Sequence, residues 1–191
     1  MTTRRILLAL AAVALVMLTA WLASRDAPRA TPGDPTAAQP ASILLRPHSP
    51  VLGAAQAPVT VTEFFDPSCE ACRAFHPFVK QLLVDFPGQV RVVVRYAPFH
   101  QGSDEAVAIL EAAREQGRFE PVLEALLRAQ PEWAVHGAPN LALAWQAAAQ
   151  AGLDVAPAKR QAAIERAKQV LAVDVADLNA VGVEKTPTFF V

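Results

Sequence analysis

The stretch VTVTEFFDPSCEAC, residues 59–72, decides the fold of this chain. Its first seven residues are β-branched or aromatic apart from Glu63 and have the length of one strand. Asp-Pro-Ser then interrupts the strand, and from Cys69 to Phe86 the apolar residues recur at helical spacing. A second β-branched run, Val90–Tyr96, follows a Pro-Gly turn. Strand, helix and strand over this length predict a βαβ unit with parallel strands.

The rest of the folded part is mostly helical and ends in a short strand. Residues 103–181 hold several runs with apolar residues at helical spacing, and residues 186–191, TPTFFV, predict a strand with a proline at its entry. The sequence therefore predicts an α/β fold over residues 51–191, with a helical subdomain at about 103–181 inserted before the last strand. Because the chain stops inside an apolar strand, we expect it to be truncated before a further strand and helix.

Residues 1–24 predict a membrane anchor or a signal peptide. A run of 18 residues, 6–23, is apolar except for Thr19, with arginines before and after it. This length lies at the lower limit for spanning a bilayer and exceeds the usual core of a signal peptide. No clear pattern of small residues marks a cleavage site, which favours an uncleaved anchor. In either case the basic N-terminus stays in the cytoplasm and the remainder is exported.

Residues 25–50 predict a linker between the membrane segment and the folded domain. They contain six prolines among Ala, Thr and Ser, a composition typical of extended, semi-rigid spacers. The predicted location is the bacterial periplasm, either anchored in the inner membrane or free after cleavage. A net charge of −1 gives no reason to expect a nucleic-acid partner.

The chain has two cysteines, Cys69 and Cys72, which lie three residues apart. A disulfide that stabilises an exported protein usually closes a longer loop, because the gain grows with loop length. At a helix start both sulfurs lie on one face within disulfide reach. The free N–H groups of the first turn stabilise a thiolate at Cys69. Cys69 is therefore predicted to attack disulfides, and Cys72 to resolve the mixed disulfide.

Glu63 is the third candidate catalytic residue. Strand alternation places it on the same face as Val61 and Phe65, and a carboxylate on an apolar face is costly to bury. We predict a buried base that takes the proton of Cys72 through water. The alternative is an edge position at which Glu63 reaches solvent.

A metal site is the alternative to redox chemistry. Cys69, Cys72 and His76 follow the helical spacing i, i+3, i+7, and His100 could complete a zinc or copper set. The sequence has no second Cys-x-x-Cys motif to support such a site. We therefore expect no metal and no cofactor other than a redox-active disulfide. A periplasmic metal-binding domain remains the second hypothesis.

The predicted strand, the Cys-Glu-Ala-Cys helix start and the late Thr-Pro-Thr segment together resemble the thioredoxin superfamily. The large helical insert is similar to its DsbA-like branch, and the resemblance covers residues 57–191. It implies that Pro187 has a cis peptide bond and packs against the disulfide, and that the backbone at Thr186 binds substrate. It also implies that Glu63 is a buried acid. The function implied is thiol:disulfide exchange with exported proteins, supported by a redox partner in the membrane.

The sequence departs from the family pattern at one point. DsbA-like oxidants usually read Cys-Pro-His-Cys, whereas the dipeptide here is Glu70-Ala71. An acid beside the nucleophile, with no cation, predicts a less stable thiolate and a less oxidising disulfide. The direction of electron flow, as oxidase, reductase or isomerase, therefore stays open.

Overall fold

A computed structural model describes residues 43–191 of the protein. The predicted membrane segment and most of the predicted linker lie outside the described residues. The described part contains four strands and six helices, in the order β1 (Val51–Gly53), β2 (Val59–Phe65), α2 (Glu70–Asp85), β3 (Val90–Tyr96), α3 (Ser103–Glu115), α4 (Phe119–Trp133), α5 (Leu141–Gln150), α6 (Val155–Ala158), α7 (Gln161–Ala180) and β4 (Thr188–Phe190). Within residues 43–191, no helix combines the length and the apolar character that a membrane crossing requires.

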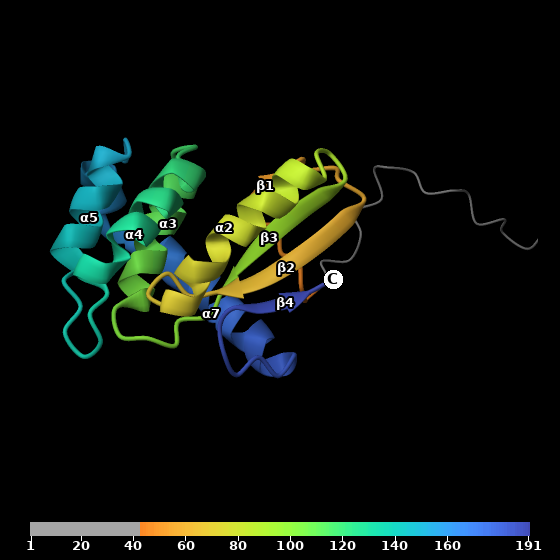
Figure 1. Ribbon diagram of the computed structural model, residues 1–191. Coiled ribbons are helices and arrows are strands. Elements are labelled where there is room, and N and C mark those ends of the chain that lie inside the picture. Colours follow the sequence, from red (N-terminus) through yellow and green to blue (C-terminus); the bar gives the residue numbers. More distant parts are fainter. Residues whose placement is uncertain (1–42) are drawn as a thin grey trace, which may run out of the picture. The chain divides into compact units, whose positions relative to one another are not determined.

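The strands form one sheet in the order β1-β3-β2-β4 (Figure 1). Strands β2 and β3 pair in parallel from Val59 opposite Val90 to Phe65 opposite Tyr96. Strands β1 and β4 pair antiparallel with β3 and β2, respectively. The parallel pair joined by α2 confirms the predicted βαβ unit, and it makes β2 a central strand with a neighbour on each side.

Alternation along the strands divides the sheet into two faces. Val61 and Phe65 join the larger core, which also contains Val79 of α2 and the buried residues of the helical insert. Phe64 points to the other face, where it packs in a second cluster with Leu178 of α7. Figure 1 shows α2 lying along one face of the sheet, while α3, α4 and α5 form the inserted helical subdomain beside it. The predicted fold class is confirmed.

The apolar stripe of α2 is only partly buried. Val79 is 5% exposed, whereas Phe75 and Phe78 are 49% and 70% exposed. Together with residues of β2, β3 and β4, the two phenylalanines line an open apolar groove of about 680 Å³. Helical periodicity predicts which residues share a face, but it does not say how much of that face is covered.

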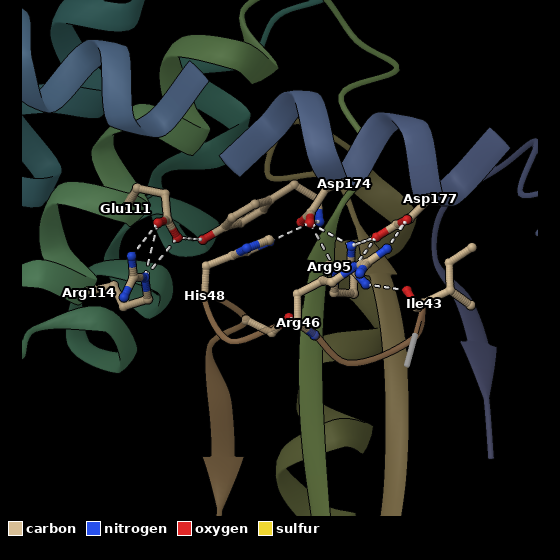
Figure 2. A network of polar contacts seen from close by, with 10 residues as sticks. Ile43, Arg46, His48, Arg95, Glu111, Arg114, Asp174 and Asp177 are labelled. Atoms are coloured by element: carbon tan, nitrogen blue, oxygen red, sulfur yellow. Dashed lines mark hydrogen bonds and ion pairs between the residues drawn. The ribbon is translucent and has the colours of Figure 1, made fainter. Parts of the chain in front are cut away.

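The end of the predicted linker belongs to the domain, because residues 43–50 pack against the sheet face opposite α2. Arg95 of β3 is fully buried, and its guanidinium donates to Asp174 Oδ1 at 2.7 Å and Asp177 Oδ2 at 2.6 Å (Figure 2). Arg46 forms two 2.7 Å hydrogen bonds with the carboxylate of Asp177, and His48 Nε2 lies 2.7 Å from Asp174 Oδ1. Residues 43–50 therefore belong to the folded domain and not to the linker. Proline content alone could not predict this, because the contacts are made by the polar residues between the prolines.

Candidate active site

The two cysteines stand at the point where β2 leads into α2. Cys69 is the N-cap residue of α2 and is 5% exposed, while Cys72 lies in the first turn and is fully buried. The backbone N–H of Asp66 donates to Cys72 Sγ at 3.5 Å. Burial raises the pKa of the Cys72 thiol well above its usual range, and the nearby Cys69 and Glu63 raise it further. Cys72 is thus the more deeply buried member of the pair, and its environment favours the protonated thiol.

The loop before β4 lies against the Cys69 sulfur. The Cys69 thiol donates to the carbonyl oxygen of Thr186 at 3.4 Å, and the Thr186–Pro187 peptide bond is cis, as the resemblance implies. Residues more than a hundred positions apart in the sequence therefore meet at the redox pair. The structure therefore brings Thr186 to the Cys69–Cys72 pair, with Pro187 next to it in the chain.

Glu63 lies on the α2 side of the sheet and is 3% exposed. It faces Val94 across one neighbouring strand and Phe189 across the other, so the alternative of a solvated edge position is wrong. Burial raises the pKa of the Glu63 carboxyl from 4.5 to about 7. An acid with this pKa changes its protonation state near neutral pH, and its charge is felt at Cys72. The environment suits a base, while the catalytic role stays a prediction.

Asp66 organises the segment between β2 and the cysteines. Its buried carboxylate accepts from the backbone N–H of Ser68 and Phe99 at 2.8 Å, and from the backbone N–H of His100 at 3.1 Å. It also accepts from the Ser103 hydroxyl and lies 2.7 Å from His100 Nδ1. These contacts hold the end of β2 to the loop that follows β3. In the sequence, Asp66 signals only the end of a strand, so this role was missed.

Gln130 of α4 links the helical insert to the redox pair. Its side-chain amide donates to the carbonyl oxygens of Pro67 at 2.8 Å and Cys69 at 3.0 Å, and accepts from Arg73 Nε at 2.9 Å. The residue is 1% exposed. Sequence reasoning did not select it, although one signal was present. Gln130 is a polar residue on the apolar stripe of α4 that includes Leu126.

The acid beside the nucleophile has two histidines as neighbours. Glu70 Oε1 lies 2.8 Å from His136 Nε2, and the ring of His100 lies 5.5 Å from that of His136. A hydrogen bond from its own backbone N–H lowers the pKa of Glu70, and the two histidines lower it further. The expectation of an uncompensated acid therefore needs correction. His136 comes from the loop after α4, which the sequence does not place near the cysteines.

The metal set considered from the sequence does not come together. Across the described part of the chain, one group of three potential ligands has its atoms within 4.8 Å of one another, and it consists of Glu70, His100 and His136. His76 lies outside this group on α2, where burial lowers its pKa. Cys72 and His76 share a helix face by spacing, but they do not converge on one point.

The fold and the dithiol site define the class of thioredoxin-like oxidoreductases, and comparison with known proteins agrees. Residues 46–191 match the family described as Thioredoxin, and the chain belongs to that family. A thioredoxin-like oxidoreductase from Silicibacter pomeroyi is 33% identical, with a TM-score of 0.64, and the match covers 76% of this chain and 80% of that one. BdbD from Bacillus subtilis is 25% identical, with a TM-score of 0.61, covering 75% of this chain and 80% of that one. Alpha-DsbA1 from Wolbachia pipientis is 25% identical, with a TM-score of 0.60, covering 77% of this chain and 76% of that one, so the fold is similar to that of DsbA-type proteins.

Curated proteins similar to the chain are larger. Na(+)/H(+) antiporter NhaA 3 of Salinispora tropica is 36% identical over 188 residues, which cover 91% of this chain and 28% of that protein. The chain thus spans about a quarter of the length of the curated relatives it matches. The similarity is confined to the segment of those proteins that aligns with this chain.

Proposed function

We propose that the protein exchanges disulfides with exported proteins through Cys69 and Cys72. The observation that carries this proposal is the position of the Cys69 sulfur. It lies 3.4 Å from the Thr186 carbonyl oxygen, while Cys72 is fully buried. A substrate that pairs with the backbone at Thr186 brings its own sulfur to Cys69 and not to Cys72. Pro187, next in the chain, completes the substrate-binding loop.

In the reducing direction the exchange has two steps. The Cys69 thiolate attacks a substrate disulfide, so that a Cys69–substrate bond forms and one substrate thiolate leaves. Cys72 then loses its proton and attacks Cys69 Sγ, which forms the Cys69–Cys72 disulfide and releases the second substrate thiolate. Two electrons pass to the substrate. The reverse sequence oxidises a substrate dithiol and leaves the protein reduced.

Glu63 acts in the second step. Burial holds the Cys72 thiol in its protonated form, so attack requires a base. Glu63, with a pKa of about 7, takes this proton through a water molecule. Once protonated, Glu63 passes the proton to the substrate thiolate that leaves, which restores its charged form for the next cycle.

The protein's setting completes the proposal. The N-terminal segment anchors it in a bacterial inner membrane or directs its export, and the domain works in the periplasm. A redox partner in the membrane renews the Cys69–Cys72 pair in its active oxidation state. One solved relative is a periplasmic thioredoxin-like protein of Salmonella enterica.

Trapping of mixed disulfides tests the roles of the two cysteines. The Cys72→Ser variant should accumulate a covalent adduct with a disulfide-containing protein substrate, which non-reducing electrophoresis and mass spectrometry detect. Cys69→Ser should form no adduct, and it serves as the matched control. Full turnover by Cys72→Ala with a protein substrate would contradict the two-cysteine mechanism.

A further inference from the structure

Three side chains from three separate elements converge beside the redox pair. Glu70 is the first residue of α2, His100 lies in the loop between β3 and α3, and His136 lies in the loop between α4 and α5. Their ligand atoms all lie within 4.8 Å of one another. His136 Nε2 already contacts Glu70 Oε1 at 2.8 Å. None of these contacts is required by the disulfide exchange described above.

A second observation concerns His100, whose ring is held by a buried carboxylate. Nδ1 of His100 lies 2.7 Å from Asp66 Oδ2, and Asp66 is fully buried. When Nδ1 of the neutral ring donates to this carboxylate, the lone pair is on Nε2 and can bind a metal ion. Histidines that bind metals almost always donate their other ring N–H to a carboxylate, a carbonyl oxygen or water in this way.

We propose that Glu70, His100 and His136 bind a divalent transition-metal ion, with Zn²⁺ the best match, at the rim of the dithiol site. Two imidazoles and one carboxylate, with an open position for water, are a common zinc ligand set. Imidazole ligands favour Zn²⁺ and its first-row neighbours over Mg²⁺ and Ca²⁺, which prefer oxygen. The site is new relative to the cysteine-based set considered from the sequence, because it contains neither Cys69 nor Cys72.

Binding requires only a small rearrangement. Tetrahedral Zn²⁺ with bonds of about 2.1 Å places its ligand atoms about 3.4 Å apart, so the most distant pair of ligand atoms, at most 4.8 Å apart, must close by somewhat more than 1 Å. The side chains of His136 and Glu70 are 64% and 54% exposed and can rotate. The contact between them lies at the surface, where such pairs contribute little to stability. A metal ion that displaces this contact therefore costs the protein little stability.

Metal titration of a cysteine-free protein tests the site. In a Cys69→Ser/Cys72→Ser background, one equivalent of Zn²⁺ should bind, measured by competition with a chromophoric chelator. Co²⁺ should give visible absorption bands without a sulfur-to-metal charge-transfer band. His136→Ala removes an exposed side chain, so the fold should persist while affinity falls at least tenfold. Glu70→Gln should also weaken binding.

His76→Ala is the matched control, because it removes a histidine outside the cluster and should leave the affinity unchanged. Failure of the cysteine-free protein to bind one equivalent would overturn the proposal. So would an equal loss of affinity in His76→Ala and His136→Ala. The background variant cannot exchange disulfides, so the result is independent of the function proposed above.

Discussion

Replacing Glu63 with Gln should make the domain more stable at neutral pH while slowing its chemistry. Burial raises the pKa of Glu63 from 4.5 to about 7, and each unit corresponds to about 1.4 kcal/mol. The native state keeps a proton that the unfolded state loses, so stability falls as pH rises from 4.5 to 7 and stays lower above that. The full penalty is about 3 kcal/mol. Gln carries no charge, so the variant does not lose this stability.

Urea unfolding of the reduced protein at pH 4 and pH 8 measures this effect. We expect the Glu63→Gln variant and the native sequence to differ little at pH 4, and the variant to be up to about 3 kcal/mol more stable at pH 8. Glu120→Gln removes an exposed carboxylate and serves as the control, with no change at either pH. A variant that is no more stable than the native sequence at pH 8 would refute the argument that ionisation of buried Glu63 lowers the stability of the native state.

The same variant should be a poorer catalyst. Without a base for the Cys72 proton, release of substrate from the mixed disulfide should slow by about a hundredfold or more near pH 7. The pH profile of that step should lose its inflection near pH 7. Stopped-flow measurement of release separates this step from the initial attack at Cys69, whose rate should be unchanged. An unaltered profile would exclude Glu63 as the base.

Three further changes have defined outcomes. Gln130→Leu leaves buried carbonyl oxygens and a guanidinium without their partner, so it should lower the free energy of unfolding by about 1–3 kcal/mol in urea titrations. Arg46→Met removes the main cause of the low pKa of Asp177, about 2, so it should lower the free energy of unfolding at pH 7. That loss should shrink as the pH falls from 4 towards 2, because the Asp177 carboxylate stabilises the native state only while it is ionised. Changing Glu70 to Pro and Ala71 to His should raise the reduction potential by no more than about 30 mV in a glutathione titration, since the acid is largely exposed and already faces a histidine.

The redox pair and the strands around it could be predicted because local rules determine them. Alternation in residues 59–65 placed Glu63 on a buried face, and the change of period at Cys69 marked the start of α2. The two strand ranges agree with the prediction. Pairing with β4 on the far side of β2 then made burial of Glu63 complete, which alternation alone could not establish.

The residues that were missed act across long sequence separations. Gln130 is 61 residues from Cys69, whose carbonyl oxygen it binds, and no periodicity relates the two. His136 reaches Glu70 only because α4 packs near α2. The sequence also assigned residues 43–50 to the linker on their prolines. Buried Arg95 needs hydrogen-bond acceptors. The carbonyl oxygen of Ile43 is one of them, beside Asp174, so this segment packs against the sheet.

The Arg95 cluster has a consequence for how the domain opens. It joins residues 43–48, strand β3 and helix α7, and the backbone N–H of Tyr96 also donates to Asp174 in it. Releasing the first segment would leave Asp174 and Asp177 facing Arg95 alone, with one uncompensated buried charge. The segment should therefore not fray separately from the sheet. Its protected amides should exchange with deuterium as slowly as those of β3, through global unfolding alone.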